Sequence, residues 1–87
     1  MIEILKNRAV MNVKILLFGM LEDIAGKNSL EIKNASDTGI LRKKVEELYP
    51  AFCEANYVIA VNRKIINSDQ PISEEDEIAL LPPFAGG

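Results

Sequence analysis

The sequence has 87 residues and a mass of 9.6 kDa, enough for one small domain. A net charge of −3 argues against nucleic-acid binding, because neutralising phosphates requires a concentrated excess of Lys and Arg. With no histidine and one cysteine, the chain cannot build a Cys/His zinc site, a histidine-dependent triad or an internal disulfide. We therefore expect a cytoplasmic protein without a bound metal. The longest apolar run, Ile15 to Leu21, is shorter than the ~20 residues of a membrane span, so no membrane association is expected.

Hydrophobic patterns along the chain predict strands and one helix. Apolar, β-branched or alternating stretches predict strands at 13–18, 29–33, 57–61, 64–66 and 78–81. Asp37 is a good N-cap for an amphipathic helix that Pro50 stops. The apolar face of this helix carries Leu41, Val45 and Leu48, with Phe52 in line.

The segments between these elements have the composition of loops and turns. Met20 to Gly26 are expected to loop out, and Gly26 to Asn28 to turn the chain into the second strand. Asn62-Arg63 predicts a tight turn, and the acidic stretch Glu74 to Glu77 a solvated loop. Pro82-Pro83 ends the last strand, because proline cannot donate to a strand ladder.

The element order is strand, strand, helix, strand, short strand, strand. This order predicts an α+β domain of the ubiquitin-like β-grasp type, with a mixed sheet of four to five strands. Its first and last strands lie side by side in the middle, and one main helix packs across one face. Residues 1–10 are expected to form an extension outside the fold, 11–81 the β-grasp domain and 82–87 an extended C-terminal tail.

The end of the sequence carries the strongest functional signal. Gly86 and Gly87 lack Cβ atoms, so their backbone can thread a narrow channel and bring an α-carboxylate to an activated phosphate in another protein. Six residues follow Leu81 and can extend roughly 20 Å, which is enough to reach a buried pocket. Pro82 and Pro83 favour a stiff path that lowers the cost of insertion.

Three segments resemble the small-subunit family of molybdopterin synthase: Val-Lys-Ile-Leu-Leu-Phe at 13–18, Ala-Val-Asn at 60–62 and Asp-Glu-Ile-Ala-Leu-Leu-Pro-Pro-Phe-Ala-Gly-Gly at 76–87. The resemblance covers residues 11–87 and departs from the family at Glu75, where a glycine is usual. It implies a sulfur carrier of a heterotetrameric enzyme. An E1-like enzyme would adenylate Gly87 with ATP, and a sulfurtransferase or desulfurase would supply the sulfur for a thiocarboxylate. Gly86 would give clearance for the tail.

The resemblance also implies how the carrier acts. The catalytic pocket would lie in the large subunit, where the sulfur is delivered to the cyclic pyranopterin precursor. No permanently bound cofactor is implied, only the transient acyl-adenylate and thiocarboxylate. The family's partner-facing patch corresponds to Phe18, Ile65 and Leu81, followed by Pro82, Pro83 and Phe84 in the tail.

Other interpretations of these residues remain open. Phe18, Ile65 and Leu81 could be ordinary core, and Cys53 is expected to be a small buried hydrophobe rather than a sulfur-handling thiol. Arg63 and Lys64 are expected to be solvated. The chain could instead carry sulfur for thiamine or cysteine biosynthesis, form isopeptide bonds as a ubiquitin-like modifier, or be an interaction module. A stand-alone enzyme is the weakest option.

Overall fold

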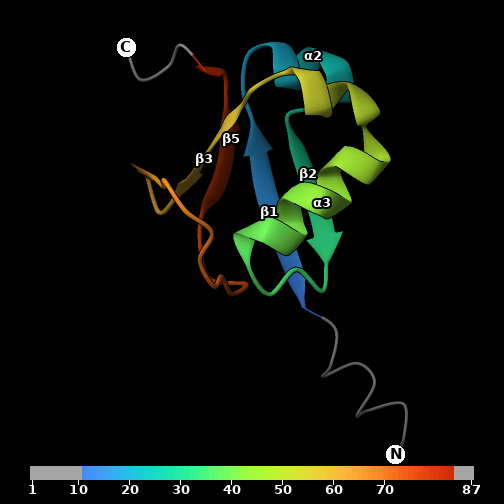
Figure 1. The fold of residues 1–87 in the computed structure, drawn as a ribbon. Coiled ribbons are helices and arrows are strands. Elements are labelled where there is room, and N and C mark those ends of the chain that lie inside the picture. Colours follow the sequence, from blue (N-terminus) through green and yellow to red (C-terminus); the bar gives the residue numbers. More distant parts are fainter. Residues whose placement is uncertain (1–10, 84–87) are drawn as a thin grey trace, which may run out of the picture.

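The computed structural model describes residues 11–83 and contains one mixed five-stranded sheet (Figure 1). The strands are β1 (Asn12–Leu17), β2 (Ser29–Lys33), β3 (Val58–Val61), β4 (Lys64–Ile65) and β5 (Ile78–Leu81). Their order across the sheet is β2-β1-β5-β3-β4. The first and last strands, β1 and β5, are parallel neighbours in the centre, and all other pairs are antiparallel. This arrangement confirms the predicted β-grasp fold.

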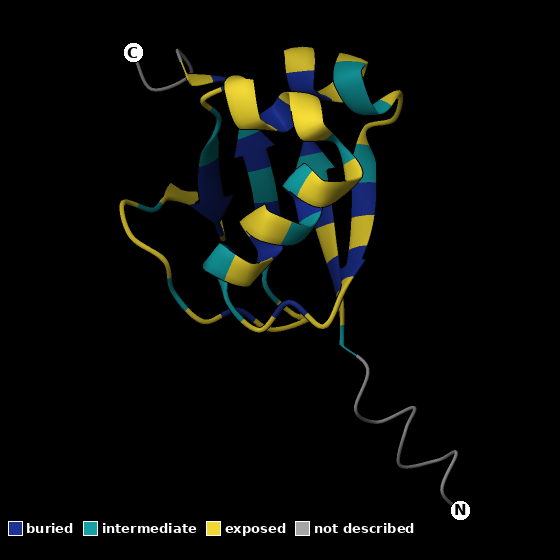
Figure 2. Cartoon of the chain, turned by 45° about the vertical axis from the view of Figure 1, so that its right-hand side comes forward, coloured by how far each residue is buried: buried dark blue, intermediate teal, exposed yellow. Residues whose placement is uncertain are grey.

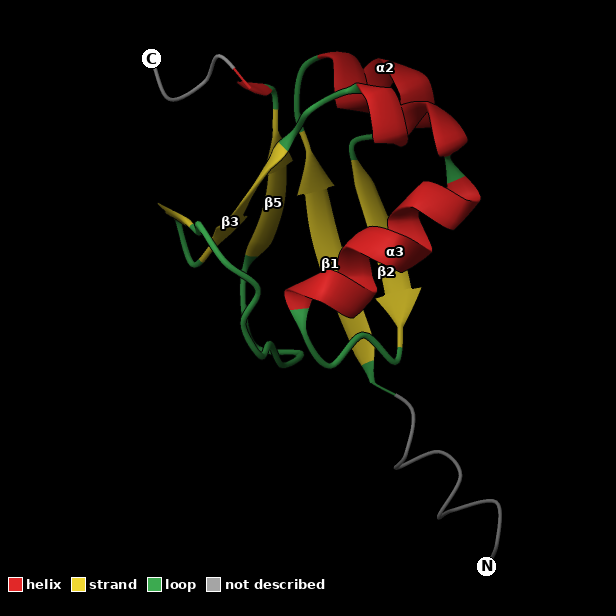
Figure 3. Ribbon diagram, viewed as in Figure 1, coloured by secondary structure: helices red, strands yellow, loops and turns green. Residues whose placement is uncertain are grey.

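Helical segments cover one face of the sheet (Figure 3). They are α2 (Met20–Ala25), α3 (Thr38–Leu48) and the 3-10 helix η1 (Pro50–Glu54). The predicted cap of α3 is confirmed, because Asp37 Oδ1 accepts a hydrogen bond of 2.8 Å from the backbone N–H of Ile40. None of the helices within residues 11–83 is both long enough and apolar enough to span a bilayer.

The core lies between the sheet and these helices. Val13, Ile15 and Leu17 of β1 are buried, as their alternation along the strand predicts. Phe52 is fully buried and packs between two tyrosines, with ring centroids 5.5 Å from Tyr49 and 5.8 Å from Tyr57. Such aromatic pairs add about 0.5–1.5 kcal/mol each beyond the burial of their area.

Met20–Ala25 form a short helix that Gly26 caps, so the expectation of a loop at 20–26 was wrong. Leu21 is fully buried, and this burial holds α2 on the core although the helix begins without a capping side chain. Gly26 adopts a left-handed conformation, with φ of 75°, and its N–H donates to the carbonyl of Glu22. This glycine cap was the available sequence signal for the helix.

The predicted apolar face of α3 is correct at Leu41 and Val45 but wrong at Leu48, which is 60% exposed. The helix ends at Leu48, and Pro50 starts the 3-10 helix that was not predicted. This second segment turns Phe52 into the core, so the space that Leu48 would fill is already occupied. Leu48 lies instead beside β2 at the rim of the helix layer.

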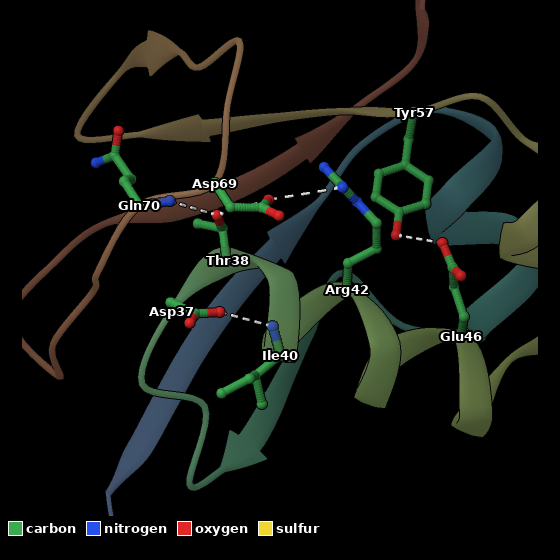
Figure 4. Close-up of polar contacts among 8 residues, drawn as sticks. All are labelled: Asp37, Thr38, Ile40, Arg42, Glu46, Tyr57, Asp69 and Gln70. Carbon is green, nitrogen blue, oxygen red and sulfur yellow. Dashed lines mark hydrogen bonds and ion pairs between the residues drawn. The ribbon is translucent and has the colours of Figure 1, made fainter.

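Two polar features fix the connections around the sheet. The predicted turn at Asn62-Arg63 is confirmed, with φ of 53° and 70°, the signature of a type I′ hairpin. Figure 4 shows the second feature, in which the loop before Pro71 is tied to the start of α3. The buried Thr38 hydroxyl accepts from the N–H of Gln70 at 3.0 Å and donates to Asp69 at 3.1 Å.

Candidate functional site: the open sheet face and the C-terminal exit

The sheet face opposite α3 carries apolar side chains that the core does not use. Residues paired across neighbouring strands point to the same face, so the register identifies this set. Ala79 pairs with Leu16 and Ala60, Ala60 also pairs with Ile65, and Leu81 pairs with Val58. Together with Phe18, which follows β1 and lines a pocket with Lys14 and Leu16 of this face, they form what we call the open-face patch: Leu16, Phe18, Val58, Ala60, Ile65, Ala79 and Leu81.

Large side chains of the open-face patch are partly exposed. Phe18 is 44% exposed and Ile65 47%, while Leu81 is half-buried. Ala60 is buried but is not part of the core cluster. It lies on the open face of the sheet, where its larger neighbours cover its small side chain. The structure thus places all three predicted patch residues on one face and makes none of them a core residue. Contiguous exposed apolar surface of this kind marks interaction sites.

The chain leaves the sheet at the edge of this patch. Leu17 pairs with Leu80 in the parallel ladder, so Phe18 and Leu81 follow at the same end of adjacent strands. Pro82 comes next and is buried, whereas Pro83 is exposed. The residues beyond Pro83 therefore start from the end of β1 and β5 at which Phe18 lies.

Pro82 packs directly against Gly19. A Cβ at position 19 would lie 2.6 Å from Cγ of Pro82, closer than carbon atoms tolerate. Gly19 also has φ of 61° and ψ of −135°, a backbone conformation that strongly favours glycine. The carbonyl of Gly19 accepts a hydrogen bond from the N–H of Glu22, and this bond closes the first turn of α2. Gly19 was not singled out in the sequence, because a lone glycine does not reveal a contact with a residue 63 positions away.

Charged residues border the open-face patch. The acidic stretch is solvent-exposed except at the half-buried Asp76, in agreement with the predicted loop. Hydrogen bonds from the Asn62 amide and the Ser73 backbone N–H hold the pKa of Asp76 below its usual value. Arg63 is exposed, as predicted, and lies 3.3 Å from Glu77. Within residues 11–83 no group of three or more acidic, cysteine or histidine side chains is placed to hold a metal ion.

Cys53 is exposed, so the expectation of a buried hydrophobe was wrong. Its thiol lies on η1, 3.5 Å from Oε1 of Glu46. Local desolvation, the hydrogen bond to Glu46 and the negative charges of Glu46 and Glu54 raise the pKa of this thiol. Because the thiolate is the reactive form, Cys53 is poorly suited to sulfur transfer.

The remaining predicted site residues, Phe84, Gly86 and Gly87, lie outside the described residues, as does the 1–10 extension. Their assigned roles stay predictions. The structure describes the open-face patch and Pro82, which precede these residues in the chain.

Comparisons with known proteins agree with this geometry. The ThiS family model matches residues 15–87, which includes the part of β1 that pairs with β5, all of β5 and the Gly-Gly end. The chain is 37% identical to the molybdopterin synthase sulfur carrier subunit of Dictyostelium discoideum, over 85% of this chain and 94% of that one.

Two solved structures share the fold. The small archaeal modifier protein 1 of Methanosarcina acetivorans superposes with a TM-score of 0.74 at 22% identity, over 90% of this chain and 98% of that one. A chain from the complex of subunits 1 and 2 of the molybdopterin-converting factor of Helicobacter pylori gives a TM-score of 0.65 at 29% identity, over 88% and 100%. Sequence match and fold together show that this chain belongs to the ThiS family.

Proposed function

We propose that this protein is the cytoplasmic sulfur carrier subunit of a molybdopterin synthase, with Gly87 carrying the sulfur as a thiocarboxylate. The observation that carries the proposal is the match of a sulfur-carrier family model through residue 87. The relatives reported above include a molybdopterin synthase sulfur carrier subunit at 37% identity.

Loading of the tail takes place in two steps. A carboxylate oxygen of Gly87 attacks the α-phosphate of ATP in an E1-like enzyme, forming an acyl-adenylate and releasing pyrophosphate. A sulfur nucleophile, supplied as a persulfide by a desulfurase or sulfurtransferase, then attacks the carbonyl carbon and AMP leaves. Reduction of the resulting acyl disulfide by a thiol releases the thiocarboxylate. In this proposal the E1-like enzyme and the sulfur donor perform the catalysis, and this chain supplies the reacting carboxylate of Gly87.

Unloading takes place in the large subunit. There the thiocarboxylate donates its sulfur to the cyclic pyranopterin precursor, and water returns the terminal glycine to a carboxylate. The open-face patch is the docking surface for this partner, since Phe18 and Leu81 flank the point from which Pro82 leads the chain away. Docking there brings the terminal residues to the partner without unfolding the domain.

Intact-mass spectrometry tests the proposal directly. The full chain is incubated with an E1-like enzyme, ATP and a sulfur donor, and should gain about 16 Da, the difference between one sulfur and one oxygen atom. The added mass should be located at Gly87. Deleting Gly87, or adding one residue after it, should abolish the gain, because either change moves the reacting carboxylate.

Two controls make the mass result decisive. Cys53→Ser should load as the natural chain does, since the thiol has no part in the proposal. Mass gain in the tail variants, or sulfur located on Cys53, would contradict the carrier mechanism. Isopeptide conjugates forming under the same conditions would instead identify a protein modifier.

A further inference from the structure

The outer edge of β2 offers backbone hydrogen-bonding groups that no strand of the described sheet pairs with. Within residues 11–83, β2 is an edge strand and pairs only with β1. Asn28 accepts from the N–H of Leu17, and the N–H of Asn34 donates to Met11. Backbone groups alternate sides along a strand, so residues 30 and 32 also face β1. The N–H and C=O groups of Ser29, Glu31 and Lys33 therefore point outward.

Side chains along this edge carry alternating charge. Glu31 and Lys33 are both exposed and point to the open face, while the buried Ile32 between them points to the core. On the helix side, a groove of about 310 Å³ is lined by Ile32, Lys44, Glu47 and Leu48 together with the edge residues. The Lys44 ammonium donates to the outward carbonyl of Lys33 at 3.0 Å. Figure 2 shows the alternation of buried and exposed residues along β2.

We propose that this edge binds the same edge of a second copy, forming a two-fold symmetric dimer centred on Ile32. In an antiparallel pair with that centre, Glu31 lies opposite Lys33 of the second copy, and Lys33 lies opposite its Glu31. Both residues have outward backbone groups, so each such pair can exchange N–H···O bonds across the interface. Opposite charges directly across an antiparallel pair are favourable.

The neighbouring symmetric registers are disfavoured by charge. A two-fold axis at Glu31 places two glutamates face to face, and an axis at Lys33 places two lysines face to face. An axis that falls between two residues would place a residue whose backbone groups point outward opposite one whose groups point toward β1. Such a register cannot form the hydrogen-bond ladder. The alternation of Glu31, Ile32 and Lys33 therefore selects the register centred on Ile32.

The groove beside β2 is self-complementary in the same way. Leu48 is 60% exposed beside Ile32, so a two-fold axis through Ile32 brings an apolar side chain of each copy toward the interface centre. Lys44 and Glu47 carry opposite charges on the same rim, and the two-fold operation presents the same pair on the second copy. This dimer leaves Pro82 free, because β1 separates β2 from β5.

Sedimentation analysis of the full chain over a concentration series tests the dimer. The natural chain should show a monomer–dimer equilibrium. Lys33→Glu should weaken dimerisation at least tenfold, because it places two carboxylates directly opposite each other at both ends of the paired segment. The charge-swapped variant carrying Lys33→Glu and Glu31→Lys, together with Lys14→Glu to keep opposite charges across the β1–β2 pair of residues 14 and 31, should regain an affinity within about threefold of the natural chain.

Lys64→Glu is the matched control, because it makes the same charge change on the opposite edge strand. It should leave dimerisation unchanged. A natural chain that stays monomeric throughout, a Lys33→Glu variant that dimerises normally, or a charge swap that fails to restore the dimer would overturn the proposal. These measurements involve no sulfur chemistry, so their result is separate from that of the proposed function.

Discussion

Glu46 on α3 accepts hydrogen bonds from two side chains that can lose a proton. Its Oε2 accepts from the Tyr57 hydroxyl at 2.8 Å, and its Oε1 from the Cys53 thiol at 3.5 Å (Figure 4 shows the tyrosine contact). Burial of the Tyr57 ring, the hydrogen bond and the charge of Glu46 raise the pKa of the phenol well above its usual range. One carboxylate thus keeps two acidic side chains in their neutral forms.

Replacing Glu46 should activate Cys53. Glu46→Gln removes a negative charge beside the thiol, so the pKa of Cys53 should fall toward its usual 9.0. We expect alkylation by iodoacetamide at pH 8 to become roughly twofold to fivefold faster. Glu47→Gln, a neighbouring substitution on the exposed side of α3, should leave the rate unchanged. Equal rates in both variants would show that the Glu46 contact does not control the thiol.

Asp76 should titrate at lower pH than an ordinary aspartate. Its depressed pKa means that the charged form stabilises the fold above the usual aspartate range, and that this contribution is lost as pH falls through the folded-state pKa. Asn62→Gly keeps the positive φ of the turn but removes the amide donor, so the Asp76 pKa should rise toward 3.8. Carboxyl NMR titration measures it, with the exposed Asn67→Gly as the control that should cause no shift.

At the scale of elements, α3 and η1 act as one unit bent at Tyr49. The helix places Leu41 and Val45 on the sheet and leaves Leu48, its last residue, exposed, while η1 adds the buried Phe52. Burial in this region therefore depends on the bend as well as on helical periodicity.

Substitutions at the two ends of α3 should differ strongly. Leu41→Ala empties a fully buried site and should cost about 2–5 kcal/mol of unfolding free energy. Leu48→Ala should cost less than about 1 kcal/mol, since most of the side chain is already in water. Urea denaturation of dilute protein compares the two. Similar losses would mean that Leu48 packs in the core as its spacing predicted.

Local patterns predict much of this molecule because they act over short distances. The alternation in β1, the Asp37 cap and the Asn62-Arg63 turn each depend on neighbours within a few residues. The strand order followed from the sequence of elements, because few topologies suit one helix and five strands. In contrast, the exposure of Leu48 and the packing of Pro82 against Gly19 depend on contacts between distant segments. The sequence alone has no local signal for such contacts.

At the scale of the whole molecule, one face of the sheet forms the core and the other is exposed to solvent. The face under α3 stabilises the domain, and the open-face patch is available to partners. Phe18 and Leu17 are adjacent in sequence but belong to opposite faces, with exposures of 44% and 2%. Substitutions at these two adjacent positions can therefore distinguish an effect on partner binding from an effect on folding.

Phe18→Asp should weaken the complex with the large subunit by tenfold or more, because a charge at the centre of an interface is desolvated without a partner. The same variant should lower the melting temperature by only a few degrees. Leu17→Asp should instead unfold the domain, since it buries an unpaired charge. Calorimetric titration and thermal melts measure the two effects. Comparable damage to stability and binding by Phe18→Asp would place Phe18 in the core.

In the proposed function, the contact between Pro82 and Gly19 sets the length of chain that ends in the reacting carboxylate. Measured from Pro82, five residues extend to Gly87 and span at most about 17 Å. A carboxylate confined to a hemisphere of that radius has a local concentration on the order of 0.1 M relative to any pocket within it. Doubling the tether would double this radius and dilute the group about eightfold. Under the proposed function, the pockets of the activating enzyme and of the large subunit must therefore both open within about this radius of Pro82.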